Sequence, residues 1–384
     1  MLKPDYKDGS IVNLMSSISK HFGYKSKYNT IKILRASSFK GIKNIVLIII
    51  DGMGFEFLKK NGENTIFAKY LVGPITSVFP STTATAITTF LTGLPAQQHA
   101  VTGWFMFLKE IGIVSKILPF ASRAGDLDLN KFIDIKKIFN QKCFSDKIKV
   151  SSFVIQKKEI IDSDYTLTTS GKSKRLSYNS LDGFFKQIKK AVKSSNKQKY
   201  IYAYWPEFDS LSHDYGINSK KTEKHFKKLD RKLKKFLKGI EGTDSLIIIT
   251  SDHGFIDTTK KRTIILKQHP KLEECLTLPL CGEPRAVFCY VHPSKTKQFE
   301  KYVKTELKNI CYVYKSEYFI KKNYFGLFKP NRRLFDRIGD YILILKDNYV
   351  LKDNILGEKK HFHIGAHGGV SKEEMIVPLI VIKK

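Results

Sequence analysis

Short, continuous apolar runs recur along the chain, and between several of them apolar residues repeat at intervals of three and four. Continuous runs rich in β-branched residues are typical of strands buried on both faces of a sheet. The repeats from Phe226 to Ile240 and from Phe299 to Ile310 predict amphipathic helices. Strands that alternate with helices predict a three-layer αβα sandwich with a largely parallel central sheet. The apolar runs are NIVLIII (44–50), YIYAYW (200–205), SLIIITS (245–251), RAVFCYV (285–291) and MIVPLIVI (375–382).

Two stretches, at about residues 106–180 and 257–365, break this alternation, and we expect them to be insertions. The second of them keeps one strand and one helix of the pattern. We find no internal repeat and no low-complexity tract. Because the first apolar run begins at residue 44, we expect an N-terminal extension over residues 1–43 and a single domain over residues 44–384.

Composition and charge narrow the classes of protein to consider. With 42% hydrophobic and 12% aromatic residues, the 384-residue chain has the composition of a folded globular protein. A formal net charge of +31 raises the question of a nucleic-acid or membrane partner. However, only nine of the 67 basic residues are arginines, the residues that usually bind phosphate groups with two hydrogen bonds. We find no specific nucleic-acid motif. We interpret the lysines as solvated helix faces whose positive field helps to collect an anionic substrate.

The five cysteines are odd in number and include no C-x-x-C pair, which indicates reduced, mostly buried thiols. The first residues, MLKPDYKDGSIVNLMSS, lack the apolar core of a signal peptide. The longest apolar run, IVLIII at 45–50, is far too short to cross a bilayer. We therefore expect a cytoplasmic protein without a membrane span.

Acidic residues follow three of the predicted strands. Asp51 follows the first run, Asp209 and His213 follow the second, and Asp252 and His253 follow the third. In an open α/β sheet, functional residues gather beyond the carboxyl ends of the strands. An Asp-Gly turn or a helix cap explains each carboxylate singly, but explains all three together poorly.

A hydroxyl-rich segment, SVFPSTTATAITTFLTGLP at 77–95, predicts an extended stretch followed by a helix. A hydroxyl group in the first turn of that helix faces free backbone N–H groups, which suit a phosphate. For Ser81 and Thr82 we favour a role as helix caps. In addition, His367 lies in a glycine-rich turn before the last strand.

Asp and His together suit zinc or a related divalent metal. Three of each are enough for two ions, and two ions can clamp the attacking and leaving oxygens of a displacement at phosphorus. Asp209 and His213 are one helical turn apart, so both can reach one ion. The sequence therefore predicts a two-metal centre that acts on an anionic phosphate ester.

Five motifs in order make the sequence similar to the alkaline phosphatase superfamily, and within it to the type I phosphodiesterase/nucleotide pyrophosphatase family. They are IIIDGMG, FPSTTATAITTFLTGLPAQQHAVTGW, FDSLSHDYG, SDHGF and AHGGVSKEEMIVPLI. The resemblance implies an alkaline-phosphatase-like fold, hydrolysis through a phosphothreonine, and two metal ions, most simply zinc, with manganese or iron as alternatives. It implies one ion on Asp209, His213 and His367, and a second on Asp51, Asp252, His253 and the oxygen of Thr83.

Thr83 is the nucleophile by register within the family pattern, with Thr82 as the lesser alternative. His363, four residues before His367, is the second choice for the metal ligand that is assigned to His367. Two residues depart from the pattern, since Trp104 stands where many members carry a phosphoryl-binding Asn and Ala100 where a Gly is usual. Arg285 is a candidate phosphate ligand, although a surface arginine is the simpler interpretation.

The resemblance implies cleavage of phosphodiester or nucleotide pyrophosphate bonds, with an anionic phosphate ester, such as a nucleotide, as substrate. The alternative within the superfamily is a phosphomonoesterase or phosphonate hydrolase. The alternative from another class is a basic, non-catalytic protein that binds polyanions on an inactive scaffold. Such a protein is expected to have lost ligands, and here none is missing. The oligomeric state is not indicated by the sequence.

Overall fold

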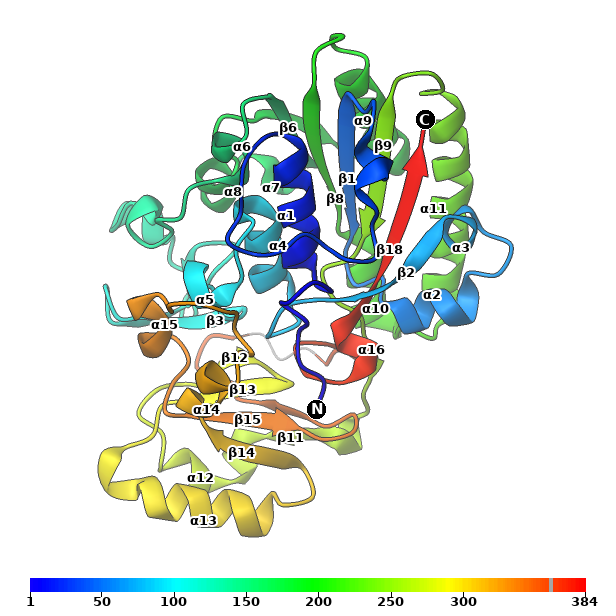
Figure 1. Ribbon diagram of the computed structural model, residues 1–384. Helices are drawn as coiled ribbons and strands as arrows, with labels where there is room; N and C mark the ends of the chain where they lie inside the picture. The colour runs from blue at the N-terminus through cyan, green and yellow to red at the C-terminus, as the bar shows by residue number, and fades with distance from the viewer. Residues whose placement is uncertain (359–361) are drawn as a thin grey trace.

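The computed structural model describes residues 1–358 and 362–384, and its larger sheet has seven strands. Five neighbouring strands are parallel, whereas β18 is antiparallel to both of its neighbours, β9 and β2 (Figure 1). This confirms the predicted, largely parallel central sheet. In spatial order the strands are β2 (Leu71–Thr76), β18 (Ile376–Lys383), β9 (Ser245–Thr250), β1 (Asn44–Ile50), β8 (Lys199–Trp205), β6 (Ser151–Lys157) and β7 (Lys174–Tyr178).

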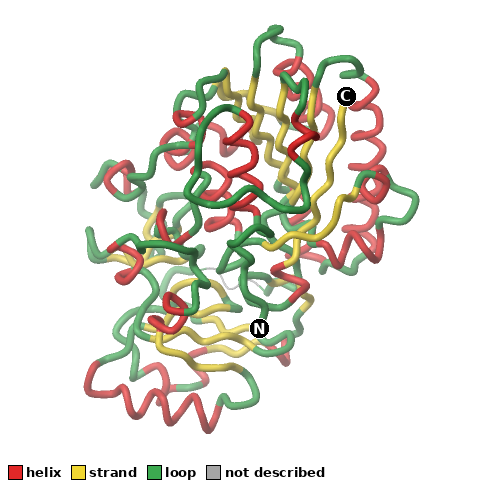
Figure 2. Tube along the Cα trace, in the orientation of Figure 1, coloured by secondary structure: helices red, strands yellow, loops and turns green. Residues whose placement is uncertain are grey.

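Helices cover both faces of this sheet (Figure 2). In β1, Leu47 packs with α1 (Ile11–His21) and α4 (Thr83–Thr92), whereas the next residue, Ile48, packs with α9 (Leu181–Val192) and α11 (Lys220–Lys238). Successive side chains of a strand point to opposite faces, so a continuous apolar run feeds two cores. The three-layer αβα sandwich is therefore confirmed.

The parallel register brings three strand ends to one edge of the sheet. Ile50 of β1 is paired with Trp205 of β8, and Ile49 is paired with Thr250 of β9. The residues that follow these strands therefore emerge side by side. Because β18 runs the opposite way, its first residues lie at the same edge, and the turn that precedes it reaches the same place.

A second seven-stranded sheet lies below the first in Figure 1, and all of its strand pairs are antiparallel. The run RAVFCYV, which resembles the runs of the large sheet, forms β13 in this one. The run is apolar throughout because β13 is also covered on both sides, with Phe288 in one core and Val287 in another. The strand order is β14 (Cys311–Lys315), β15 (Tyr341–Leu345), β13 (Ala286–Cys289), β12 (Cys281–Glu283), β3 (Phe105–Leu108), β4 (Ile113–Lys116) and β5 (Ala121–Ser122).

The expected N-terminal extension and the first expected insertion both supply elements that pack within the main body. Residues 106–180 supply β6 and β7 to the large sheet, and α1, from residues 1–43, contacts α4. The other helices are α2 (Phe55–Asn61), α3 (Ile66–Lys69), α5 (Ala96–His99), α6 (Phe144–Lys147), α7 (Lys158–Ile161), α8 (Asp164–Thr169), α10 (Glu207–Tyr215), α12 (Pro270–Glu273), α13 (Thr296–Glu306), α14 (Ser316–Lys321), α15 (Arg332–Asp336) and α16 (Lys372–Met375). Two short pairs complete the strands, β10 (Ile256–Asp257) with β17 (Gly365–Ala366), and β11 (Thr263–Ile265) with β16 (Val350–Lys352).

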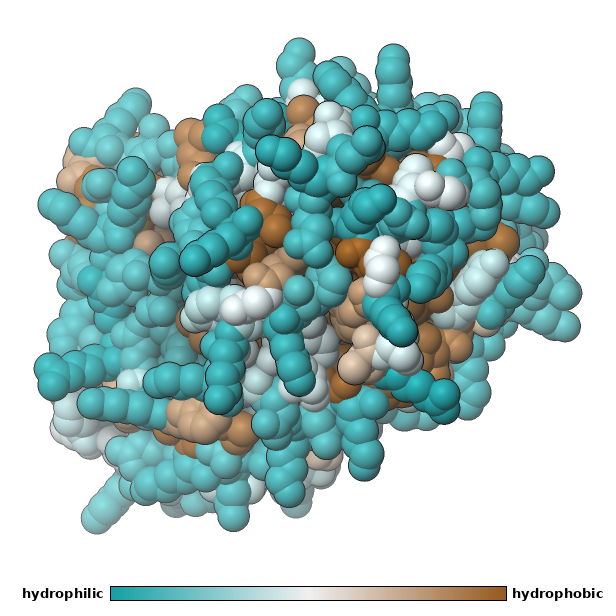
Figure 3. All heavy atoms as spheres, turned by 45° about the horizontal axis from the view of Figure 1, so that its top comes forward, coloured by the Kyte–Doolittle hydropathy of each residue, from teal (hydrophilic) through white to brown (hydrophobic). Residues whose placement is uncertain are grey.

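The surface agrees with the interpretation of the lysines. Figure 3 shows one face covered largely by hydrophilic side chains, with apolar atoms in scattered patches. In α11 the apolar residues from Phe226 to Leu237 are buried, whereas most of its lysines are exposed. All five cysteines are free and buried, as expected. Among the described residues, no helix is both long and apolar enough to cross a membrane.

Candidate active site

The three carboxylates expected at the strand ends meet around one imidazole. Asp51 follows β1, Asp252 follows β9, and Asp209 lies in the first turn of α10, after β8. The Nε2 atom of His253 is 3.3 Å from Oδ1 of Asp51, 3.5 Å from Oδ2 of Asp252 and 3.9 Å from Oδ1 of Asp209. The parallel register thus gathers residues that are up to about 200 positions apart in the sequence into one cluster.

His213 and His367 complete this cluster. Nε2 of His213 is 3.4 Å from Oδ1 of Asp209 and 3.2 Å from Nε2 of His367. The rings of His367 and His253 stack with their centroids 3.7 Å apart. The ring centroid of His363, the second choice for the ligand, is 4.7 Å from that of His213, so this residue lies beside the cluster as well.

All three imidazoles of the cluster are oriented in the same way. In each ring, Nδ1 lies close to a main-chain carbonyl oxygen. The distance is 2.9 Å from His213 to Gly365, 3.1 Å from His253 to Gly254, and 3.3 Å from His367 to Ser81. A carbonyl oxygen only accepts hydrogen bonds, so Nδ1 carries the proton in each ring. The Nε2 lone pairs therefore face the cluster, as in histidines that bind metal.

The carboxylates have oxygens that no protein group satisfies. Oδ1 of Asp252 accepts the N–H groups of Gly52 and His253, each at 3.1 Å, and Oδ2 of Asp51 accepts the hydroxyl of Tyr204. Oδ1 of Asp51, Oδ1 of Asp209 and Oδ2 of Asp252 are buried and have no hydrogen-bond partner in the described structure. Buried polar atoms rarely stay unpaired, and these three are the oxygens that surround His253. Divalent cations would satisfy all of them, so the residues fit a metal centre.

Burial shifts the protonation equilibria of the cluster, and the raised pKa values of the carboxyl groups reflect crowded negative charge that a bound cation would relieve. It raises the pKa of Asp51 to about 6 and that of Asp252 to about 8, where the charge of Asp51 adds to the effect. It lowers the pKa of His213 to about 3 and that of His367 well below its usual value. The imidazoles of His213 and His367 are therefore neutral, as metal ligands must be, and the carboxylates lack a compensating positive charge.

Two overlapping groups of ligand atoms can each hold an ion. One consists of Asp51, Asp252 and His253, and the other of Asp209, His253 and His367. The group of Asp51, Asp252 and His253, together with the oxygen of Thr83, is one of the two ligand sets that the resemblance implies. In the other implied set His213 replaces His253, and the position of His213 between Asp209 and His367 is compatible with that arrangement.

The three hydroxyl groups at the start of α4 have different partners. Ser81 donates to the carbonyl oxygen of Gly369 at 2.9 Å, and Thr82 donates to Oε1 of Glu283 at 2.7 Å. Thr82 is the N-cap residue by position, yet its side chain makes no cap hydrogen bond. Oγ1 of Thr83, the first residue of the helix, lies 3.2 Å from Nε2 of His253. Of the three, Thr83 therefore faces the cluster.

Glu283 belongs to this region, although the sequence analysis did not single it out. It ends β12, and Oε1 accepts both the hydroxyl of Thr82 and the N–H of Trp104, each at 2.7 Å. Trp104, at the expected Asn position, is thus joined to the nucleophile turn through its main chain. The only feature of the sequence that marks Glu283 is its position just before the apolar run at 285–291, and acidic residues are common in such positions.

Arg285 corrects the expectation of a surface arginine. It is only 1% exposed, so it is not a surface arginine. Its Nε and Nη2 atoms donate to the two carboxylate oxygens of Glu374 at 3.2 and 3.0 Å, and Nη1 donates to the carbonyl oxygens of Lys346 and Tyr349. Glu374 also accepts the N–H of Gly369 at 2.8 Å, close to His367. These contacts use four of the five N–H donors of the guanidinium group and hold the turn after His367 in place.

We expect Arg285→Met to lower the free energy of unfolding by about 3 to 5 kcal/mol, because it leaves the Glu374 carboxylate buried without its partner. Urea unfolding measures this. The double variant Arg285→Met/Glu374→Gln removes both charges, keeps an acceptor for Gly369, and should recover part of the loss. A raised KM for substrate with unchanged unfolding would instead return Arg285 to a substrate-binding role.

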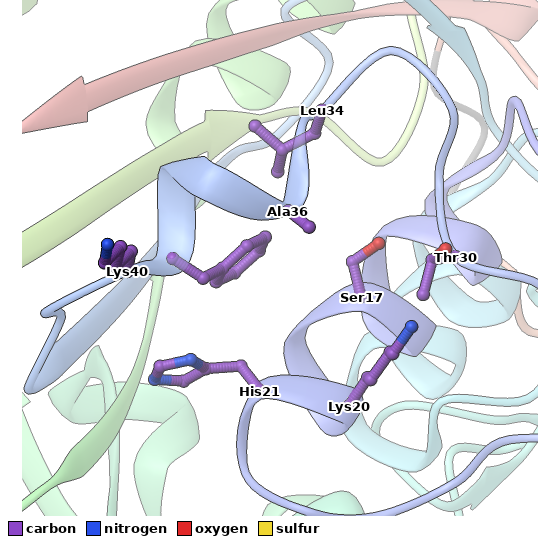
Figure 4. A pocket seen from close by; sticks show the side chains of 8 residues that line it. Ser17, Lys20, His21, Thr30, Leu34, Ala36 and Lys40 are labelled. Carbon is purple, nitrogen blue, oxygen red and sulfur yellow. The ribbon is translucent and has the colours of Figure 1, made fainter.

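A pocket of about 340 Å³ lies elsewhere, between α1 and the 3-10 turn Ala36–Phe39 (Figure 4). Its lining includes Lys20, His21 and Lys40. None of the clustered Asp and His residues lines it. The candidate chemistry therefore belongs to the edge of the sheet and not to this pocket.

A three-layer αβα body that carries this Asp and His cluster, with a hydroxyl group at a helix start beside it, defines a phosphoester hydrolase of the alkaline phosphatase superfamily. The model of the type I phosphodiesterase/nucleotide pyrophosphatase family matches residues 45–370. The chain therefore belongs to this family of phosphoester hydrolases. A sequence search of curated proteins gives no match.

Solved structures share the fold. Murine ectonucleotide pyrophosphatase/phosphodiesterase 5 is similar with a TM-score of 0.68 and 20% identity, over 87% of each chain. An inactive variant of that protein is known in complex with AMP. Phosphonoacetate hydrolase from Sinorhizobium meliloti 1021, in complex with phosphonoacetate, has a TM-score of 0.64 and 15% identity, over 88% of this chain and 89% of that one.

Proposed function

We propose that the protein is a metal-dependent hydrolase that cleaves phosphodiester or nucleotide pyrophosphate bonds, with Thr83 as the nucleophile. The observation that carries the proposal is the set of three buried, unpaired carboxylate oxygens around Nε2 of His253, which is itself 3.2 Å from Oγ1 of Thr83. The complex of the murine relative's inactive variant with AMP supports a nucleotide as one class of substrate.

Two divalent ions fit the cluster. Asp209, His213 and His367 would hold one, and Asp51, Asp252, His253 and the Thr83 oxygen would hold the other. Mixed Asp and His donors favour Zn²⁺, with Mn²⁺ or iron as the alternatives. When bound, such ions supply positive charge that stabilises an ionised hydroxyl and the charge that develops at phosphorus.

The chain itself positions the reaction. Thr83 is fixed as the first residue of α4, where the positive end of the helix dipole and free N–H groups face an anionic ester. Its oxygen attacks phosphorus as the leaving group departs on the opposite side, which forms a phosphothreonine. Water then cleaves the new P–O bond and regenerates Thr83. Ser81 and Thr82, whose hydroxyls bind other groups, hold the turn in place.

The second candidate is a phosphonate hydrolase or phosphomonoesterase, because the solved phosphonoacetate complex has the same fold. A polyanion-binding protein on an inactive scaffold is the non-enzymatic alternative. A complete cluster with three suitably oriented histidines argues against it, since a scaffold without catalytic function is under no requirement to keep every ligand. The non-enzymatic alternative predicts tight polyanion binding that weakens as the salt concentration rises and does not change when chelator is added.

The test compares bis-p-nitrophenyl phosphate with p-nitrophenyl phosphate, using protein that has been loaded with zinc or treated with chelator. We expect the diester to be preferred, chelation to lower its hydrolysis at least about 100-fold, and added zinc to restore it. A preference for the monoester would favour the second candidate. Hydrolysis that survives complete removal of metal would contradict the two-metal mechanism.

A further inference from the structure

Glu283 contacts all three turns that surround Thr83. Its Oε1 atom accepts the Thr82 hydroxyl and the Trp104 N–H, each at 2.7 Å. A Cβ atom added to Gly368, next to His367, would lie only 2.5 Å from the Cβ atom of Glu283, so the side chain packs directly against that turn. A single carboxyl group therefore joins the nucleophile turn, the turn with the unusual Trp104, and the His367 turn.

The two oxygens of this carboxyl group are not equivalent. Both hydrogen bonds go to Oε1, and Oε2 makes none with the residues that the structure describes. Oε2 is also not among the fully buried unpaired atoms, unlike the three oxygens that surround His253. Oε2 therefore keeps some exposure, although Glu283 as a whole is only 6% exposed.

The charge of Glu283 acts on the site. Burial has the largest part in raising the pKa of Asp209, and the negative charge of Glu283 adds to it. Burial also raises the pKa of Glu283, to about 7, so the group is ionised in mildly alkaline solution. No cationic side chain is paired with it among the described ion pairs, in contrast to the nearby Glu374.

We propose that Glu283 is a specificity-determining residue that makes the site prefer phosphodiesters to phosphomonoesters. A monoester dianion carries a second negative charge on an oxygen that is esterified in a diester. A fixed carboxylate beside the Thr83 turn repels this second charge, and the main-chain N–H of Trp104 donates to Glu283, so it does not offset the negative charge for an incoming oxygen. The inference rests on the proposed function, because it assumes that the ester is attacked at Thr83.

The test uses two substrates with the same leaving group, methyl p-nitrophenyl phosphate and p-nitrophenyl phosphate, with zinc-loaded protein at about pH 8.5, above the pKa of Glu283. Glu283→Gln keeps an acceptor for Thr82 and Trp104 and removes only the charge. We expect the diester-to-monoester ratio of kcat/KM to fall by about 10-fold or more. The control Glu273→Gln, which removes one charge from an exposed position of α12, should leave the ratio unchanged.

Equal losses of both activities in Glu283→Gln would show a merely structural role and overturn the inference, as would an unchanged ratio. In either case hydrolysis that still depends on Thr83 and metal would leave the proposed function standing. A wild-type protein that prefers the monoester would also overturn the inference. Hydrolysis of neither ester would overturn the proposed function and this inference together.

Discussion

Thr83→Ala is expected to lower the hydrolysis of bis-p-nitrophenyl phosphate by about 1,000-fold or more, with the metal content unchanged. The substitution removes the only hydroxyl of the α4 turn that faces His253 and leaves the Asp and His cluster intact. Loss of a nucleophile typically costs several powers of ten in rate, because the remaining groups still bind but no longer form the covalent intermediate. Steady-state kinetics on zinc-loaded protein, with metal analysis, measure the effect.

Thr82→Val is the matched control. It removes the neighbouring hydroxyl, which is bound to Glu283, and should cost less than about 10-fold in rate. Acid quenching during turnover followed by peptide mass analysis should find a phosphoryl group on Thr83 in the wild-type protein. If Thr82→Val were the inactive variant, or if the phosphoryl group were found on Thr82, the register that selects Thr83 would be wrong.

Asp209→Asn is expected to remove about one of two bound ions and to lower diester hydrolysis by about 1,000-fold or more. Asp209 contributes a buried, unpaired oxygen that is 3.4 Å from Nε2 of His213 and 3.9 Å from Nε2 of His367. An amide in its place has no charge with which to neutralise a cation, and its NH₂ group can point into the site. Metal analysis after gel filtration and the diester assay measure the two effects separately.

Asp214→Asn, on the exposed side of the same helix α10, is the matched control and should keep both ions. Unfolding of both variants in the presence of chelator separates metal loss from misfolding. Because Oδ1 of Asp209 is buried among other acids, its substitution should leave the free energy of unfolding of the metal-free protein unchanged or higher. Full activity of Asp209→Asn with two ions bound would contradict the proposed ligand set.

Much of the fold could be predicted from the sequence because the runs that form β1, β8 and β9 are apolar throughout and are followed by polar turns. The same signal failed for β13, since a run covered on both faces looks alike in a parallel and in an antiparallel sheet. The short strands β3 to β5 have no such pattern, and only pairing across long loops reveals them. The sequence therefore indicated the large sheet and missed the second one.

Some residues of the candidate site could likewise be predicted from the sequence, and others could not. Asp51, Asp209 and Asp252 could be placed together because parallel strands that end at one edge bring their next residues together. His367 could be singled out by its glycine-rich turn, but its place in a ligand set depended on the family resemblance, since it precedes an antiparallel strand. Glu283 and the pairing of Arg285 with Glu374 could not be foreseen, because they depend on how β12 and β13 of the second sheet meet the turn after His367.

The place of β18 bears on how the protein matures. This strand follows all others along the chain, yet it lies between β9 and β2 inside the large sheet. During synthesis the edges of β9 and β2 that pair with β18 stay unpaired until β18 has been made, and exposed edges of this kind invite aggregation. The turn with His367 docks in the same late step. A nascent chain that lacks β18 and the His367 turn therefore holds only one of the two proposed ligand sets in full, and a two-metal centre should form only once β18 has entered the sheet.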